Sequence, residues 1–590
     1  MIRNRLLSVA GVLLSLGAVT TACGDGEADV GGGGQGGEGT GGSGTGGSGT
    51  GGGGPLECPG EQVLCSAECV TLANNRDHCG ACDTACGTGE LCVAGGCEDS
   101  CTGALLACGL SCIDPKTDPD YCGATNCGAT TGVGVACASD ETCDQGVCNE
   151  IPSAWHPGAR VDDATSSIDE EQAIATDSAG NAIVVYRQLI DSTNIQTGRT
   201  FARFYDVATS SWLPAVQLDQ GSLRVRNPQV AMSADGDAIA IWISGPITGA
   251  ASVQAAFFNG QTRTWSATQR LDDQNTVASN PSVALDADGD GFVAWSQDLE
   301  GGGDRPRIIV SSWNGSAFST ATPLPAIGDS QAYFPRVAIN DAGLAGLAWE
   351  EFDIDGGSLG VYAPMASVYD GNAWSAPVDL RTEDDVLLEA YGRYPDVGID
   401  DAGNVTVVYA RDIYLTDVSI FASVYTATGT PGWAPAAAAE SVSVPATDPR
   451  LVVDRAGLAT LVFQVAAYDG SGELESYADI YGGRRVTGSW STSAVVSDVS
   501  PGQRATPQVS ADENGAAVAF WLNTIDATFK VMTSRYIGTA WGTPVVLNAG
   551  VVNAGAAFSP SLAISPSGDG FASWVQALPG VQTLYVSKFD

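Results

Sequence analysis

The side chains that could contact a ligand follow a repeated aromatic residue between residues 151 and 590. In most repeats the residue two positions later is polar, and at the two-residue period of a β-strand both side chains lie on the same side of the strand. Two interpretations stay open: these polar side chains ring a ligand site beside a central channel, or they are solvated strand ends. The ligand-face candidates are Gln188, Gln297, Glu351, Arg411, Asn523 and Gln576.

A second candidate site is an acidic turn with the pattern D-x-D-x-D-G. Asp286, Asp288 and Asp290 match the first half of a calcium-binding loop, and oxygen-rich turns suit this hard cation. The twelfth position holds Gln297 in place of the bidentate glutamate, and the other repeats do not carry the triplet. The alternatives are therefore a calcium site and an acidic hairpin turn without a metal; no other cofactor is expected.

Catalysis by a histidine triad or a histidine-rich metal site is close to excluded. The chain has only two histidines, His78 and His156. Hydrolysis of a sialidase-like kind would need an arginine cluster and a carboxylate pair on one face. Arg393, Tyr394, Arg411 and Glu351 are available for such a site, but no motif fixes them.

These candidates lie in a unit of about 55 residues that recurs along the chain. It is clearest in PSVALDADGDGFVAW, from Pro281 to Trp295, where two apolar runs flank an Asp/Gly turn. A repeat of this length built from strands and turns is typical of a propeller or a similar array. The turn glycines are Gly180, Gly236, Gly289, Gly343, Gly403, Gly457, Gly515 and Gly568.

Each repeat contains four strands, called A to D in chain order. The chain enters this region at Trp155 with a D strand and ends around residues 585–589 with a C strand. Pairing these two segments completes an eighth blade and removes an open sheet edge. We therefore predict an all-β fold, an eight-bladed β-propeller over residues 151–590 closed by an N-terminal strand; a seven-bladed ring with one aberrant repeat is the alternative.

The aromatic that closes strand B recurs in every blade, which favours packing between neighbouring blades over a role as a sugar-stacking platform. The Asp/Gly turns between strands A and B are short, whereas the B–C and D–A loops are long and varied. Variable loops on a rigid scaffold are where binding usually resides. We expect a ligand on the face that carries the B–C and D–A loops.

The P-x-V-A-x-D-x-x-G-N layout of these repeats resembles that of NHL-type propeller repeats. It also loosely resembles the sialidase Asp-box, although the serine and threonine of that box are not kept. Both resemblances span residues 151–590 and imply a propeller. Neither carries a set of site residues to this chain.

Residues 56–150 form a cysteine-rich region made of two sets of eight cysteines with nearly the same spacing. A duplicated module of this size has too small an apolar core to fold alone, and exported modules of this kind are stabilised by disulfides. A zinc site at Cys79-Gly-Ala-Cys82 is the alternative. The predicted disulfide cysteines are Cys58, Cys65, Cys69, Cys79, Cys82, Cys86, Cys92, Cys97, Cys101, Cys108, Cys112, Cys122, Cys127, Cys137, Cys143 and Cys148.

The segment NNRDHCGACDTACGTGELCVAGGC resembles the stigma-specific cysteine-rich protein family and related bacterial secreted modules. His78 stands where that motif has asparagine. The resemblance implies an extracellular disulfide-bonded interaction or spacer module without catalytic residues.

The N-terminus has the features of an export signal over residues 1–22. Arg3 and Arg5 precede an apolar run that is too short for a comfortable membrane span. TTAC, ending at Cys23, resembles a bacterial lipobox and implies lipidation of Cys23, although Thr20 departs from that motif. Ordinary cleavage nearby is the alternative. Residues 23–55 are rich in Gly, Ser and Thr and are expected to be a flexible tether.

The formal net charge of −42 argues against a nucleic-acid partner, because such a protein must neutralise phosphates. We expect a monomer attached through its lipid to an outer membrane or cell surface. Three functions stay open: a non-catalytic binding or adhesion module for a glycan, peptide or partner protein; a sialidase-like glycoside hydrolase; and a structural spacer without a small-molecule site.

Overall fold

The computed structural model describes most of residues 155–589 and parts of residues 62–150. In the first range, the residues outside the description are 163–166, 192–193, 195–196, 220, 222, 247–248, 273–275, 300–304, 326–329, 354–360, 388–389, 414–416, 469–473, 487, 498–502, 526–527, 538–539 and 552–553. The predicted signal, lipidation site and tether lie outside the described residues. No helix of the described part is long and apolar enough to cross a membrane.

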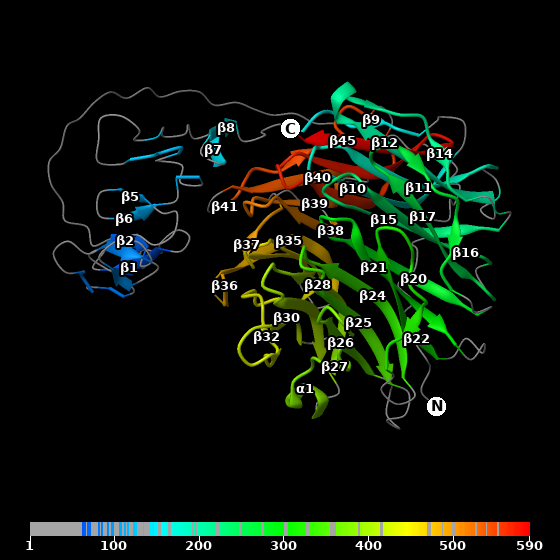
Figure 1. Cartoon of the computed structure of the whole chain (residues 1–590). Coiled ribbons are helices and arrows are strands. Elements are labelled where there is room, and N and C mark those ends of the chain that lie inside the picture. Colours follow the sequence, from blue (N-terminus) through cyan, green and yellow to red (C-terminus); the bar gives the residue numbers. More distant parts are fainter. Residues whose placement is uncertain are drawn as a thin grey trace, which may run out of the picture. The chain divides into compact units, whose positions relative to one another are not determined.

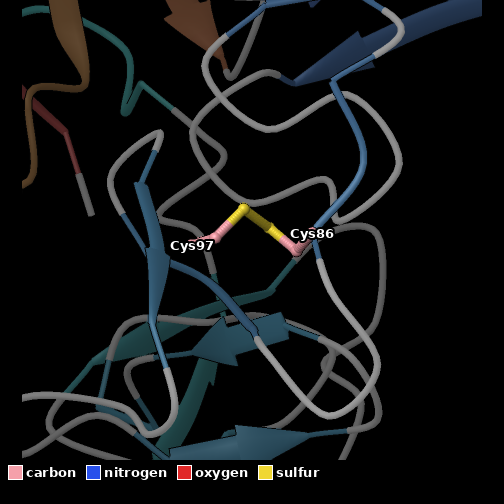
Figure 2. Close-up of a disulfide and its surroundings, with 2 residues drawn as sticks. All are labelled: Cys86 and Cys97. Carbon is pink, nitrogen blue, oxygen red and sulfur yellow. A yellow bond between two sulfur atoms is a disulfide. The ribbon is translucent and has the colours of Figure 1, made fainter.

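The described part of the cysteine-rich region contains short strands and disulfides. Cys86 and Cys97 form one disulfide, with 5.4 Å between their Cα atoms (Figure 2). Cys82 and Cys122 are also disulfide-bonded, so these four residues are not thiolate ligands of a metal. The strands are β1 (Gln62–Cys65), β2 (Glu68–Thr71), β3 (Leu91–Val93), β4 (Gly96–Glu98), β5 (Leu106–Cys108), β6 (Ser111–Ile113), β7 (Glu141–Asp144) and β8 (Val147–Glu150).

Residues 155–589 form eight antiparallel sheets, which are the blades of a propeller (Figure 1). Blade 1 consists of β10 (Ile168–Thr176), β11 (Ala182–Leu189), β12 (Gly198–Asp206), β13 (Ser211–Trp212) and β14 (Val216–Gln217). Blade 2 consists of β15 (Val225–Met232), β16 (Ala238–Ser244), β17 (Ser252–Asn259), β18 (Thr264–Trp265) and β19 (Gln269–Arg270). Blade 3 consists of β20 (Ala278–Leu285), β21 (Asp290–Asp298), β22 (Pro306–Asn314) and β23 (Thr322–Pro323). Blade 4 consists of β24 (Gln331–Ile339), β25 (Ala345–Asp353), β26 (Val361–Tyr369) and β27 (Val378–Asp379).

The remaining blades repeat this meander, and the helix α1 (Glu383–Leu387) lies between blades 4 and 5 in the chain. Blade 5 consists of β28 (Tyr391–Ile399), β29 (Val405–Ile413), β30 (Asp417–Thr426), β31 (Gly432–Trp433) and β32 (Ala437–Ala438). Blade 6 consists of β33 (Ala446–Val453), β34 (Ala459–Tyr468), β35 (Leu474–Val486), β36 (Ser489–Trp490) and β37 (Ala494–Val495). Blade 7 consists of β38 (Gln503–Ala511), β39 (Ala517–Ile525), β40 (Thr528–Ile537), β41 (Ala540–Trp541) and β42 (Val545–Val546). Blade 8 consists of β43 (Ala557–Ile564), β44 (Gly570–Leu578), β45 (Val581–Phe589) and β9 (Ala159–Arg160).

The A strands form the inner ring of the propeller. Each contacts the A strand of the next blade, and β10 of blade 1 contacts β43 of blade 8, which closes the circle. The B, C and D strands follow outward in chain order within each sheet. The predicted all-β propeller is therefore confirmed.

Both ends of the propeller chain build blade 8. β9 pairs with β45, with Ala159 opposite Val586 and Arg160 opposite Tyr585. Trp155 bridges to Phe589 at a ring-centroid distance of 5.0 Å. This confirms the predicted closure and the count of eight blades, and it rules out the seven-bladed alternative.

The aromatics that close the B strands lie in the core between blades. Trp349 of blade 4, for example, packs with Ala294 and Ile308 of blade 3. All eight of these residues are almost completely buried, so they are packing residues and not sugar-stacking platforms: Tyr186, Trp242, Trp295, Trp349, Tyr409, Phe463, Trp521 and Trp574.

Candidate functional site

Five of the six ligand-face candidates are buried, so they are not solvated strand ends. Three of them accept a hydrogen bond from the strand-B tryptophan two residues earlier. Trp295 donates to Gln297 Oε1 at 2.8 Å, and Trp574 donates to Gln576 Oε1 at 3.2 Å. Trp349 donates in the same way to Glu351. The aromatic residue and the polar residue two positions later thus lie on the same side of strand B, as predicted. There the polar side chain accepts the N–H of the buried indole.

The same side chains also reach the D–A loop that precedes their blade. Gln297 Nε2 donates to Asp272 Oδ2 at 3.2 Å and to Thr276 Oγ1 at 3.1 Å. Gln576 Nε2 donates to the carbonyl oxygen of Gly555 at 2.8 Å. These glutamines therefore hold a loop against the end of strand B.

Asn523 occupies the same position in blade 7 but is one methylene shorter. Neither its amide nor the indole N–H of Trp521 has a hydrogen-bond partner among the described residues. Gln188, in blade 1, is also buried. Neither side chain lies on an accessible surface.

Arg411 holds the helix α1 in place. Its guanidinium forms an ion pair with the buried Asp385, and it lies 4.9 Å from the ring centroid of Phe421. Asp385 in turn accepts a hydrogen bond from the backbone N–H of Thr382 at 3.0 Å. The six candidates therefore do not converge on one accessible site.

The acidic triplet forms a hairpin turn. Asp286 Oδ1 accepts the backbone N–H of Asp290 at 2.8 Å, and burial raises the pKa of the Asp286 carboxyl. Gly289 supplies the left-handed backbone of the turn, with φ of +88°. Within the described part of the chain no three His, Cys, Asp or Glu side chains form a group that could hold a metal. The calcium assignment therefore rests on the sequence alone.

A different feature of the inner ring marks an accessible site. Every A strand has a register shift against its B strand near the face that carries the B–C and D–A loops, as in the step from Tyr333 to Arg336. In blades 2 to 8 the residue before the repeated proline has a positive φ. These residues are Asn227, Asn280, Phe334, Tyr394, Asp448, Thr506 and Ser559.

Phe334 and Tyr394 stand out within this set. Short polar residues, above all Asn and Asp, tolerate a left-handed backbone, whereas a bulky side chain there is unusual. Phe334 and Tyr394 nevertheless adopt φ of +53° and +54°, and they are 48% and 40% exposed. Two neighbouring blades thus present aromatic rings to solvent at a position where packing requires none.

Arg393 links the ring of Tyr394 and that of Tyr362 to a buried carboxylate. Its Cζ atom lies 4.2 Å from the ring centroid of Tyr362 and 5.3 Å from that of Tyr394. Its Nε atom lies 3.7 Å from Glu350 Oε2, while Glu350 Oε1 accepts the backbone N–H of Tyr394 at 2.8 Å. Burial raises the pKa of Glu350, and the Tyr394 amide and Arg393 oppose that rise.

Two further arginines complete the group. Arg336 of blade 4 interacts electrostatically with Arg450 of blade 6 and with Asp396 and Asp448. Arg450 Nη2 lies 2.8 Å from Asp448 Oδ1. Arg336 is exposed to solvent. We call the following group the mouth cluster: Phe334, Arg336, Tyr362, Arg393, Tyr394 and Arg450.

Sequence reasoning named Arg393 and Tyr394 only as side chains available to a hydrolase and missed the rest of the mouth cluster. A signal was present, because Phe and Tyr precede the repeated proline where other blades have Asn, Asp, Thr or Ser. The left-handed backbone that makes this contrast informative is visible only in the structure.

A scan against protein-family models finds no match to this sequence, and a search of curated proteins finds none either. Among solved structures, a polysaccharide lyase, PL25 ulvan lyase, is 10% identical with a TM-score of 0.43, covering 73% of this chain and 95% of that chain. The Hadza microbial sialidase Hz136 is 12% identical with a TM-score of 0.32, covering 58% and 73%. The β-propeller domain of the trilobed protease from Pyrococcus furiosus is 7% identical with a TM-score of 0.38, covering 65% and 97%. At such identities the similarity concerns the propeller fold alone.

Proposed function

We propose that this chain is an exported, surface-anchored protein whose propeller binds a saccharide at the mouth cluster without cleaving it. The observation that carries the proposal is the pair of exposed rings, Phe334 and Tyr394, on adjacent inner strands. Exposed aromatic faces accept the C–H faces of sugar rings, and the strained backbone beneath these rings has an energetic cost that packing does not explain.

The arginine beside the rings suits the same ligand. The guanidinium of Arg393 stacks on Tyr362 and remains partly exposed, with 36% of its side chain accessible. A guanidinium held in this way presents donors in a fixed geometry to hydroxyl or carboxylate oxygens. The rings would supply contact area, and Arg393 would orient the ligand.

Export of the protein and its attachment to a membrane surface are part of the proposal. The basic and apolar N-terminus, followed by TTAC, supports export and lipidation at Cys23. The Gly/Ser/Thr-rich segment after it would let the folded parts reach away from the membrane surface. A display of this kind suits a protein that captures an extracellular glycan.

A glycan array probed with the purified full chain tests the proposal. We expect a restricted set of glycans to bind, and the double variant Phe334→Asn/Tyr394→Asn to lose that binding by at least about tenfold. Asparagine is the residue that blades 2 and 3 carry at this position, so the variant keeps the left-handed backbone. Thr506→Asn, at the same position in blade 7, is the matched control and should bind like the parent.

Two outcomes would contradict the proposed binding of a saccharide at the mouth cluster. If the double variant binds the same glycans with unchanged affinity, the mouth cluster is not the site. If no glycan binds the parent protein, the remaining function is that of a spacer or of an adhesin for proteins.

A second candidate, glycoside hydrolysis, has one observation in its favour. Glu350 is a buried carboxyl with a raised pKa beside Arg393 and Tyr394, and a carboxyl of this kind can serve as a general acid. Incubation of the parent and of Glu350→Gln with each bound glycan would decide: release of reducing ends by the parent only would favour the hydrolase. Glu351, the earlier candidate, is committed to Trp349.

A further inference from the structure

Three arginines belong to blades 1 and 2, whereas the mouth cluster belongs to blades 4 to 6. Arg187 is on β11, Arg224 directly precedes β15, and Arg226 is two residues further on the same side of the chain. Arg226 interacts electrostatically with both of the others. We call them the arginine cluster.

Arg187 is fixed inside the protein. Its side chain is 1% exposed, and it forms an ion pair with Glu171, with 3.8 Å between Nη1 and Oε1. Gly198 makes room for it, because a Cβ atom at that residue would overlap Nε of Arg187 and lie 3.0 Å from its Cζ. A residue with a side chain at position 198 would therefore displace the Arg187 guanidinium.

Arg226 is held by backbone oxygens. Its Nη1 donates to the carbonyl of Pro246 at 2.8 Å and to that of Gly245 at 3.3 Å. The N–H of Gly245 donates to the carbonyl of Arg224 at 2.9 Å. The loop after β16 thus fixes the segment that carries Arg224 and Arg226.

Arg224 lacks the partners that such a group needs. Its Nε and Nη1 atoms are buried and have no hydrogen-bond partner among the described residues. A buried donor without a partner is costly, and more so when it is charged. Because the guanidinium stays charged, an acceptor is needed here.

No described carboxylate accepts a hydrogen bond from Nε or Nη1 of Arg224. Glu171 is the carboxylate that interacts with the cluster, and it also accepts the backbone N–H of Asn227. Burial lowers the pKa of Arg226, and the positive charges of Arg224 and Arg187 lower it further, against the opposing effect of Glu171. The chain has 68 acidic and 26 basic residues, so a group of three arginines is unusual in it.

We propose that Arg224 and Arg226, backed by the buried charge of Arg187, form an anion-binding site for a carboxylate, sulfate or phosphate group. Planar guanidinium groups bind such oxyanions through paired N–H donors. The group would be either a small inorganic ion or an acidic substituent of a larger ligand. The site does not depend on the proposed saccharide site.

Calorimetric titration of the purified full chain with sodium sulfate, at an ionic strength held constant with sodium chloride, tests this site. We expect saturable binding of one sulfate, weakened at least tenfold in Arg224→Gln/Arg226→Gln. Arg455→Gln is the control, because Arg455 is an exposed arginine paired with Asp341. Arg224→Lys, which keeps the charge but not the paired donors, should bind with an intermediate affinity.

Glucose 6-sulfate and glucose distinguish the two sources of the anion. Tighter binding of glucose 6-sulfate than of inorganic sulfate, with no binding of glucose at this site, would identify an acidic glycan; equal binding of both sulfates would identify the ion itself. The proposal is overturned if neither sulfate, phosphate nor acetate binds saturably, or if the glutamine variant retains the parent affinity while its melting temperature shows that it is folded. Loss of glycan binding in Phe334→Asn/Tyr394→Asn would not bear on either result, because those residues lie outside the arginine cluster.

Discussion

At the scale of single residues, polar side chains in this propeller mostly serve the fold. The Trp295–Gln297 pair shows how: the glutamine satisfies a buried indole and ties a loop to the strand end. Asp219 has an equivalent task, since its Oδ1 accepts the backbone N–H of Thr200 at 2.8 Å. A polar residue at a repeated position therefore mainly pairs with a buried polar group of the fold. Asn523 and Asp219 allow direct tests of this role.

Asn523→Gln is expected to stabilise the protein. The longer side chain would accept the N–H of Trp521, as Gln297 does for Trp295, and a net gain of about 1 kcal/mol is typical of one hydrogen bond. The reverse change, Gln297→Asn, should lower stability by about 1–3 kcal/mol because it leaves a buried donor unpaired. Denaturant unfolding of both variants measures this, and a destabilised Asn523→Gln would mean that the blade cannot accept the added methylene.

Asp219→Asn is expected to remove a pH dependence of stability. Burial raises the folded-state pKa of Asp219 to about 6 from an ordinary value of 3.8, so its contribution to stability is greatest below 3.8 and declines as pH rises toward 6. The stability of the asparagine variant should therefore rise relative to that of the parent between pH 4 and pH 7. Above pH 7 the difference in stability between the two proteins should stay constant.

Asn548 provides the matched control for this prediction. It accepts the backbone N–H of Val531 at 3.0 Å, the same contact in blade 7. Asn548→Asp removes the two hydrogen bonds that Nδ2 donates to the carbonyl of Phe529 and to Gln576 Oε1, so it should lower the melting temperature. Because the new carboxyl would be buried, the melting temperature of this variant should also decline as pH rises. Parallel pH profiles for the parent and Asp219→Asn would refute the assignment to Asp219.

At the scale of elements, the ring depends on a short strand from the N-terminal side. β9 contributes two paired residues to blade 8, and Gly158 lets it approach Trp574 closely. A Cβ atom at Gly158 would lie 2.8 Å from Cζ2 of Trp574, whose side chain is buried. This junction is the one place where a blade combines both ends of the propeller chain.

Gly158→Val is therefore expected to lift β9 from blade 8 and to destabilise the protein by about 1–3 kcal/mol, as overpacking does. Gly432→Val, in the outer strand β31, is the control, because no atom lies within 4 Å of a Cβ there. Limited proteolysis near residue 158, together with the melting temperature, checks the result. Equal behaviour of the two variants would show that closure does not depend on this contact.

At the scale of the whole molecule, the sequence predicts the architecture well and the site poorly. Repeated turn glycines and the strand order at Trp155 and at residues 585–589 are enough to predict eight blades and their closure. The burial of five of the six ligand-face candidates could not be predicted, because the strand period gives the side of a strand on which a residue lies but not whether that side is covered. Phe334 and Tyr394 could not be singled out as ligand-site candidates from the sequence. Their exposure follows from a β-bulge, which the pattern of apolar residues does not reveal.

The mouth cluster is the proposed ligand site, and the affinity of Phe334→Asn/Tyr394→Asn for the array-selected glycan tests this most directly. Measured by calorimetry beside the parent and Thr506→Asn, the double variant should bind at least about tenfold more weakly while its melting temperature stays within a few degrees of the parent value. Parent-like affinity in a folded double variant would contradict the account.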